Sequence, residues 1–105
     1  MCGIAGVLIP SQTITPGVLE PMAERLAHRG PDGRGFFTEG PVGLAHTRLS
    51  IIDLEGGQQP ILTDDGRMAL VANGEIYNYV ELMDELRSQG RSFSTHSDSE
   101  TFLQA

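Results

Sequence analysis

The pattern of hydrophobic and polar residues predicts a buried strand and then an amphipathic helix at the beginning of the chain. Residues 3–9 (GIAGVLI) form an apolar run that ends at Pro10, as expected for a buried strand. Apolar residues then recur at spacings of three and four over residues 18–27, which predicts a helix. Pro16 and Pro21 are expected near the beginning of this helix, where a missing backbone donor is tolerated.

Glycine-rich turns and short β-prone runs follow this helix. Residues 30–35 (GPDGRG) are expected to form a loop because they contain three glycines and a proline. Strands are predicted over residues 36–38, 42–46 and 68–72, with turn-forming residues between them. The middle of the chain is therefore expected to be mainly β-structure.

Capping patterns predict two helices in the last third of the chain. Asn78 can cap a helix, Glu81 is its capping-box partner three residues later, and Gly90 is expected to end the helix. A short strand is predicted around Phe93. A second capping-box pattern (SDSE) begins at Ser97 and predicts a helix that has barely begun when the sequence ends. This ending predicts a fragment of a longer domain.

Composition excludes several classes of function. The chain has 105 residues and a formal net charge of −7, with seven arginines and no lysine. An acidic chain repels phosphate backbones, which argues against nucleic-acid binding. No apolar run reaches the roughly 18 residues of a membrane helix, and the N-terminus lacks the basic region of a secretory signal. One cysteine can form neither an internal disulfide nor a multi-cysteine zinc site. A cytoplasmic protein is expected.

The single cysteine lies at a position where its thiol could act as a nucleophile. Cys2 follows Met1, and methionine aminopeptidases remove an initiator methionine that precedes a small side chain. Cys2 would then carry a thiol and a free α-amine on one residue, so that the amine can act as the general base for the thiol. The alternative is a small apolar residue at the start of a strand.

Five motifs in a fixed order carry a family resemblance. MCGIAG opens the chain, HRGPDG begins at His28, AHTRLSIID spans residues 45–53, NGEIYN begins at Asn73, and HSDSE begins at His96. Together they resemble the glutaminase domain of the class II glutamine amidotransferases, which are N-terminal nucleophile hydrolases. Within that class, they are most similar to the glutamine-hydrolysing asparagine synthetases.

The resemblance implies a fold, a substrate and partners. The fold would be α+β, a four-layer αββα sandwich of which residues 1–105 supply the first half. The substrate would be L-glutamine, and the ammonia released would serve ATP-dependent asparagine synthesis in a C-terminal synthetase domain that these residues do not contain. ATP and Mg²⁺ would bind to that second domain, with no cofactor or metal in this one. The resemblance does not determine whether the protein forms a homodimer.

The resemblance also assigns catalytic groups. Cys2 would attack the side-chain carboxamide of glutamine and form a γ-glutamyl thioester with loss of ammonia. The Asn73 side-chain amide and the Gly74 backbone N–H would form the oxyanion hole. A glycine suits a donor whose backbone must approach the substrate oxygen closely. Without the resemblance, Asn73-Gly74 would be interpreted as a type I′ hairpin turn.

Three charged residues are implied in glutamine binding. Arg48 would bind the α-carboxylate, a task for which a planar guanidinium is suited. Glu75 and Asp98 would surround the α-ammonium group. The structural alternatives are a solvated surface charge for Arg48 and a helix-dipole partner for Asp98.

Two alternative functions remain open at this level. The chain could belong to an asparagine-synthetase-like amidotransferase that delivers ammonia to another acceptor, in a polysaccharide, antibiotic or exosortase-linked pathway. It could also be a degenerate, non-catalytic domain retained for regulation or dimerisation. The three histidines, His28, His46 and His96, lack the spacing of a metal site, so structural or hydrogen-bonding roles are expected for them.

Overall fold

The computed structural model describes residues 1–49 and 57–105, which form an α+β arrangement of antiparallel sheets and helices. Positions 50–53 of the AHTRLSIID motif lie outside the described residues. In chain order the elements are β1 (Gly3–Leu8), α1 (Pro16–Arg25), β2 (Gly33–Glu39), β3 (Val42–Arg48), β4 (Ile61–Leu62), β5 (Ala69–Leu70), α2 (Tyr79–Ser88) and α3 (Asp98–Gln104).

Strand β3 is the centre of a three-stranded antiparallel sheet with the order β1-β3-β2. Helix α1 packs against one face of this sheet and contacts all three strands. Leu19 and Ala23 of α1 are fully buried and form a core with Ala45 of β3 and with Ile14. Because side chains alternate along a strand, the neighbours of Ala45 in β3 point to the opposite face, away from α1.

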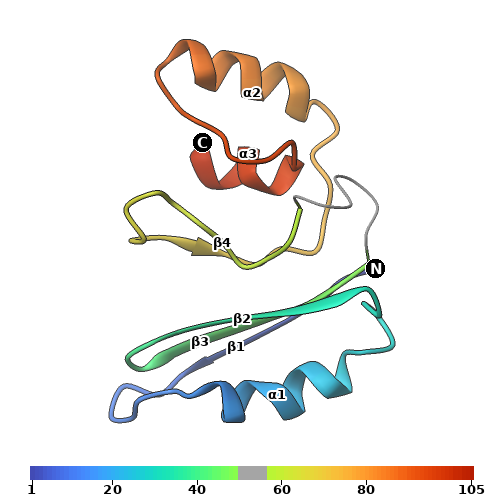
Figure 1. Cartoon of the computed structure of the whole chain (residues 1–105), viewed down its shortest axis with the longest axis vertical. Helices are drawn as coiled ribbons and strands as arrows, with labels where there is room; N and C mark the ends of the chain where they lie inside the picture. Colours follow the sequence, from blue (N-terminus) through green and yellow to red (C-terminus); the bar gives the residue numbers. More distant parts are fainter. Residues whose placement is uncertain (50–56) are drawn as a thin grey trace.

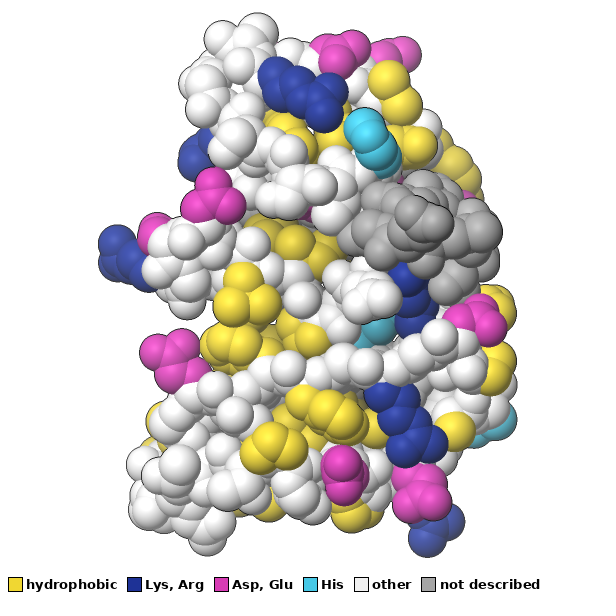
Figure 2. Space-filling view, viewed as in Figure 1, with side chains coloured by type: hydrophobic (Ala, Val, Ile, Leu, Met, Phe, Trp, Pro, Cys, Tyr) yellow, Lys and Arg dark blue, Asp and Glu magenta, His cyan; other side chains and the backbone are white. Residues whose placement is uncertain are grey.

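A two-stranded hairpin, β4-β5, forms the second sheet. Helix α3 contacts both of its strands, and α2 packs on α3. The three-stranded sheet and the hairpin therefore lie between α1 on one side and α3 with α2 on the other, with the N-terminus near the junction of the two halves (Figure 1). Hydrophobic side chains gather between the sheet and the hairpin on the face drawn in Figure 2. None of the helices formed by residues 1–49 and 57–105 is long and apolar enough to cross a membrane.

The strands predicted over residues 3–9, 36–38, 42–46 and 68–72 are confirmed as β1, β2, β3 and β5, with shifted ends. The structure differs from the strand predictions in three places. Strand β2 begins at Gly33, within the predicted loop, because Gly33 and Gly35 pair with Arg48 and His46 of β3. The two-residue strand β4 was not predicted. No strand forms around Phe93, whose ring instead lies under the Arg87 guanidinium at 5.3 Å.

The helix predictions are confirmed in position, but the capping differs in detail. Pro21 lies inside α1 rather than near its beginning. Pro21 has no backbone N–H to donate to the Gly17 carbonyl, four residues earlier in the helix. Both residues are exposed, so water can bind this carbonyl instead. Asn78 precedes α2 but makes no capping hydrogen bond with its side chain, whereas Gly90 follows α2 with a φ of 93°.

Helix α3 forms half of its predicted capping box. The Ser97 hydroxyl accepts a hydrogen bond from Ser99 N at 3.1 Å. The Glu100 carboxylate does not reach back to Ser97 N; it accepts from Ser94 N at 2.8 Å and from Thr95 N at 2.7 Å. The acid therefore fixes the loop before the helix.

Close packing at Gly35 predicts a stability difference between two neighbouring glycines of β2. A Cβ atom at Gly35 would lie 1.8 Å from the Gln59 carbonyl oxygen, whereas a Cβ at Gly33 would meet nothing within 4 Å. Gly35→Ala should lower the free energy of unfolding by about 1–3 kcal/mol, because the Gln59 backbone has to move. Gly33→Ala is the matched control and should stay within about 0.5 kcal/mol of the wild type. Urea denaturation followed by circular dichroism measures both, and equal effects would contradict this packing.

Candidate active site

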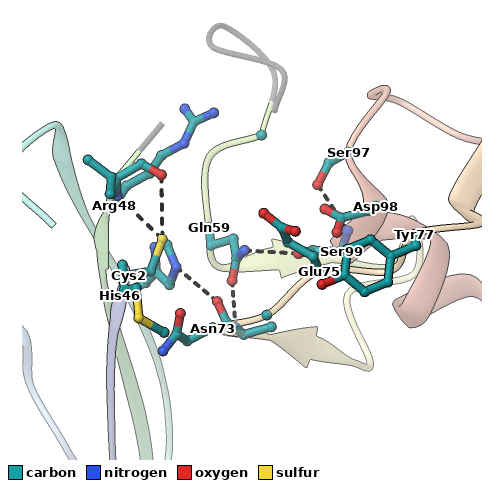
Figure 3. A pocket seen from close by; sticks show the side chains of 15 residues that line it. Cys2, His46, Arg48, Gln59, Asn73, Glu75, Tyr77, Ser97, Asp98 and Ser99 are labelled. Atoms are coloured by element: carbon teal, nitrogen blue, oxygen red, sulfur yellow. Dashed lines mark hydrogen bonds between the residues drawn. The ribbon is translucent and has the colours of Figure 1, made fainter. Parts of the chain in front are cut away.

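A cavity of about 270 Å³ lies where the end of β3, the segment after β5 and the beginning of α3 meet the N-terminus. All six residues to which the sequence assigned catalysis or substrate binding line this cavity: Cys2, Arg48, Asn73, Gly74, Glu75 and Asp98. Figure 3 shows that Cys2, His46 and Arg48 form one wall, while Glu75, Tyr77 and Asp98 form the facing wall. Segments as distant in the sequence as residues 2 and 98 thus converge.

The Cys2 thiol is half-buried at the start of β1 and is held by backbone groups. Leu49 N donates a hydrogen bond to Cys2 Sγ at 3.3 Å, and Sγ lies 3.7 Å from Leu49 O. The Cys2 carbonyl accepts a hydrogen bond from Arg29 Nε at 3.3 Å. Met1 also lines the cavity and is 68% exposed, so its removal would sacrifice little packing.

Side-chain hydrogen bonds anchor the chain directly after the thiol. Gly3 N donates to Thr47 Oγ1 at 3.2 Å, and the same hydroxyl donates to Leu26 O at 3.1 Å. Thr47 is fully buried, and a Cβ at Gly3 would lie 2.6 Å from its Oγ1. The position of the thiol is therefore fixed by the packing of β1 between β3 and the end of α1.

Arg48 is buried, which rules out the alternative of a solvated surface charge. The residue is 7% exposed at the end of β3. Asp98 is 6% exposed at the first position of α3, and its Oδ2 accepts a hydrogen bond from Ile76 N at 2.8 Å. A first-turn acid also interacts favourably with the helix dipole, so the structural alternative for Asp98 is compatible with a second role in the cavity.

Asn73 and Gly74 do not form the type I′ turn that the structural alternative required. That turn needs positive φ at both central residues, and Gly74 is not among the glycines with positive φ. The residues lie with Glu75 in an exposed segment after β5, outside any strand or helix. A Cβ at Gly74 would meet no atom within 4 Å, so the backbone there borders open space.

His46 is a cavity residue that the sequence could not distinguish from an ordinary structural histidine. It is buried in β3, and its Nε2 donates a hydrogen bond to Ala72 O at 3.2 Å, which confirms the hydrogen-bonding role expected from the sequence. Burial lowers the pKa of His46, and the nearby positive charge of Arg48 adds to this effect. A neutral imidazole that donates from Nε2 leaves Nδ1 without a proton.

Polar groups from two further segments complete the cavity. Gln59 comes from the segment before β4, and Ser97 and Ser99 come from the beginning of α3. Tyr77 lines the cavity while 92% exposed. No sequence motif pointed to Gln59.

The charges and donors of the cavity match the chemistry of an α-amino acid. One buried arginine, Arg48, lines the cavity together with two carboxylates, Glu75 and Asp98, which gives both signs of charge that a zwitterion requires. The Cys2 thiol, the Asn73 primary amide and the backbone of Gly74 lie around the same space. Within residues 1–49 and 57–105, no group of three or more His, Cys, Asp or Glu side chains could hold a metal ion.

Comparison with known proteins finds one domain family and relatives that share one name. The profile of the glutamine amidotransferase domain matches residues 1–105. Two relatives from Bacillus subtilis, the glutamine-hydrolyzing asparagine synthetases 1 and 2, are 41% and 44% identical over 98% of this chain. A glutamine-hydrolyzing asparagine synthetase from Arabidopsis thaliana is 44% identical over 95% of it. The chain spans 17%, 14% and 17% of the length of these three relatives.

Proposed function

The chain belongs to the glutamine amidotransferase domain family, and from this premise we propose that its cavity hydrolyses L-glutamine to glutamate and ammonia. The ammonia would serve ATP-dependent synthesis of asparagine from aspartate in the cytoplasm. The observation that carries the proposal is the convergence of the Cys2 thiol with a buried arginine and two carboxylates around one cavity. The relatives from Bacillus subtilis are named glutamine-hydrolyzing asparagine synthetases.

The first half of the reaction forms a thioester. Removal of Met1 gives Cys2 a free α-amine, which takes the proton of the thiol. Sγ then attacks the carboxamide carbon of glutamine, and the carbonyl oxygen becomes an oxyanion. The protonated amine donates its proton to the departing nitrogen, the C–N bond breaks, and ammonia leaves a γ-glutamyl thioester on Cys2.

The second half hydrolyses this thioester. The α-amine of Cys2 takes a proton from water, and the hydroxide that forms attacks the thioester carbon. The second tetrahedral intermediate expels the thiolate, which recovers the proton from the ammonium group, and the γ-carboxylic acid that forms releases its own proton to solvent. Glutamate and the initial state of Cys2 are the products, so the amine transfers one proton in each direction during each half-reaction.

Both tetrahedral intermediates need donors for the oxyanion. The side-chain amide of Asn73 and the backbone N–H of Gly74 would supply them from the segment after β5. Two observations support this assignment: Gly74 lines the cavity, and the space where its Cβ would lie is empty, so the backbone there is uncrowded. One donor of this kind is typically worth about 100- to 1000-fold in rate.

The substrate would be oriented by its two charged ends. The α-carboxylate would pair with the Arg48 guanidinium, and the α-ammonium would lie between Glu75 and Asp98. Because Ile76 N already binds Asp98 Oδ2, the orientation of this carboxylate is set before the substrate arrives. Burial of Arg48 strengthens its attraction for an anion relative to a solvated charge.

The architecture and the partners follow the same proposal. The placement of both sheets between α1 and α3 is compatible with part of a four-layer αββα sandwich. A C-terminal synthetase domain of the same polypeptide would bind ATP and Mg²⁺ and would adenylate aspartate. Glutaminase and synthetase activities would then be separable by mutation.

Substitution of Arg48 is expected to change the KM for glutamine more than kcat. Arg48→Ala should raise the KM for glutamine about 10- to 100-fold, because a charge-assisted pair is lost, while kcat falls much less since the thiol is retained. Arg67→Ala, in the exposed turn between β4 and β5, is the matched control and should behave as the wild type. Glutamate release by the full-length protein measures both constants. An unchanged KM for Arg48→Ala would contradict the assignment.

A further inference from the structure

The segment that carries Asn73 and Gly74 is held at both ends by side chains from other elements. Ala72, directly before it, donates its N–H to Gln59 Oε1 at 2.6 Å and accepts a hydrogen bond on its carbonyl from His46 Nε2 at 3.2 Å. At the other end, Ile76 N donates to Asp98 Oδ2 at 2.8 Å. The positions of Asn73 and Gly74 therefore depend on the side chains that bind Ala72 and Ile76.

His46 connects this segment to the strand that holds the thiol. His46 is 1% exposed and belongs to β3. It lies three residues before Leu49, whose N–H donates to Cys2 Sγ. In the sheet, His46 is the direct partner of Ile4 in β1, two residues after the cysteine. A short and rigid path therefore runs from the thiol through β3 to the Ala72 carbonyl.

Gln59 connects the same segment to helix α3. Its Oε1 accepts from Ala72 N, and its Nε2 donates to Ser99 Oγ at 3.2 Å, so both ends of its amide are used. Its backbone is packed against Gly35 of β2, where no side chain would fit. In Figure 3 the Gln59 side chain lies between the wall that carries Cys2 and the wall that carries Asp98.

We propose that His46 and Gln59 are positioning residues that clamp Ala72 and thereby place the Asn73 and Gly74 donors relative to Cys2 Sγ. This inference rests on the proposed function. Oxyanion donors must lie about 2.7–3.1 Å from the developing negative charge, and a displacement of about 1 Å can cost about 100-fold in rate. Neither side chain needs to touch the reacting atoms. Loss of the clamp should therefore lower kcat and leave the binding of glutamine largely intact.

The test uses variants that remove one contact each in the full-length protein. His46→Leu removes the donor to Ala72 O, and Gln59→Leu removes the acceptor for Ala72 N. His46→Gln is the conservative variant, because its side-chain amide nitrogen can occupy the place of Nε2 and donate in the same direction. His28→Leu and Gln58→Leu change the same residue types at exposed positions and serve as matched controls.

Three measurements separate positioning from a general structural effect. We expect kcat for glutamine hydrolysis to fall about 10- to 100-fold in both His46→Leu and Gln59→Leu. The KM for glutamine should stay within about threefold of the wild type. Alkylation of Cys2 by iodoacetamide should keep its wild-type rate, because this reaction displaces iodide and forms no oxyanion. His46→Gln should recover most of the lost kcat, and both controls should match the wild type.

Each other outcome overturns the inference. If kcat stays within about twofold of the wild type in both His46→Leu and Gln59→Leu, the hydrogen bonds to Ala72 do not affect the rate. Parallel loss of kcat and of alkylation rate, or a His46→Gln variant no better than His46→Leu, would show a structural role only. Failure of the proposed function is recognised separately, since the wild type itself would then release no glutamate from glutamine.

Discussion

Cys2→Ala is expected to abolish glutamine hydrolysis by the full-length protein while asparagine synthesis from ammonium salts continues. Without the thiol no thioester can form, and neither water nor the remaining donors replace the nucleophile. The loss of kcat should therefore reach at least about 10⁴-fold. Under the proposed function, the synthetase reaction would use ammonia, aspartate, ATP and Mg²⁺ and would not need the thiol. Asparagine formation, measured with glutamine and with ammonium chloride as alternative nitrogen sources, checks both halves of this expectation.

The same assay distinguishes the competing functions. Undiminished asparagine synthesis from glutamine by Cys2→Ala would contradict the nucleophile assignment. A wild-type protein that hydrolyses glutamine but makes asparagine from neither nitrogen source would belong to an amidotransferase with another acceptor. A wild-type protein without glutaminase activity would support a degenerate domain. The exposed-turn variant Arg67→Ala controls for nonspecific effects of substitution.

An N-terminal extension that cannot be removed is expected to eliminate glutaminase activity to the same extent. The extension converts the α-amine of Cys2 into an amide, which can neither accept the thiol proton nor return it to the leaving group. It also retains a residue at the position of Met1, which lines the cavity. Glutamate release should be undetectable, while ammonium-dependent asparagine synthesis is retained.

The matched control carries the same extension with a protease site directly before Cys2. Cleavage should restore full glutaminase activity, and mass spectrometry of the intact protein verifies the N-terminus in each sample. Wild-type turnover by a protein with the extension still attached would refute the role of the amine. Loss of activity that cleavage does not restore would indicate misfolding of the extended chain instead.

Helices and strands are predicted well where the hydrophobic pattern is long. They are predicted poorly where contacts with distant parts of the chain determine the local structure. Strands β1 and β3 and the three helices follow from apolar runs, periodicity and capping residues. The glycines at 33 and 35 favour a loop by local propensity, yet both lie in a strand because they pair with β3. The Gln59 carbonyl packs so closely against Gly35 that no side chain would fit there. Phe93 favours a strand by propensity, but its ring contacts Arg87.

The candidate site shows the same division between motif and context. The motifs identify Cys2, Arg48 and Asp98, and the structure places all three around one cavity. Sequence could not show that Arg48 is buried, because burial depends on elements that pack on β3 from distant parts of the chain. It also gave no indication of Gln59, whose importance follows from two hydrogen bonds to residues 13 and 40 positions away.

The most direct test of the central claim is detection of the covalent intermediate on Cys2. The full-length protein is mixed with glutamine, quenched in acid within one turnover and digested, and its N-terminal peptide is analysed by mass spectrometry. We predict a peptide that begins at Cys2, lacks Met1 and carries one γ-glutamyl group that hydroxylamine removes. Glutamine turnover with an unmodified Cys2 under the same conditions, or with the glutamyl group on another residue, would contradict the account.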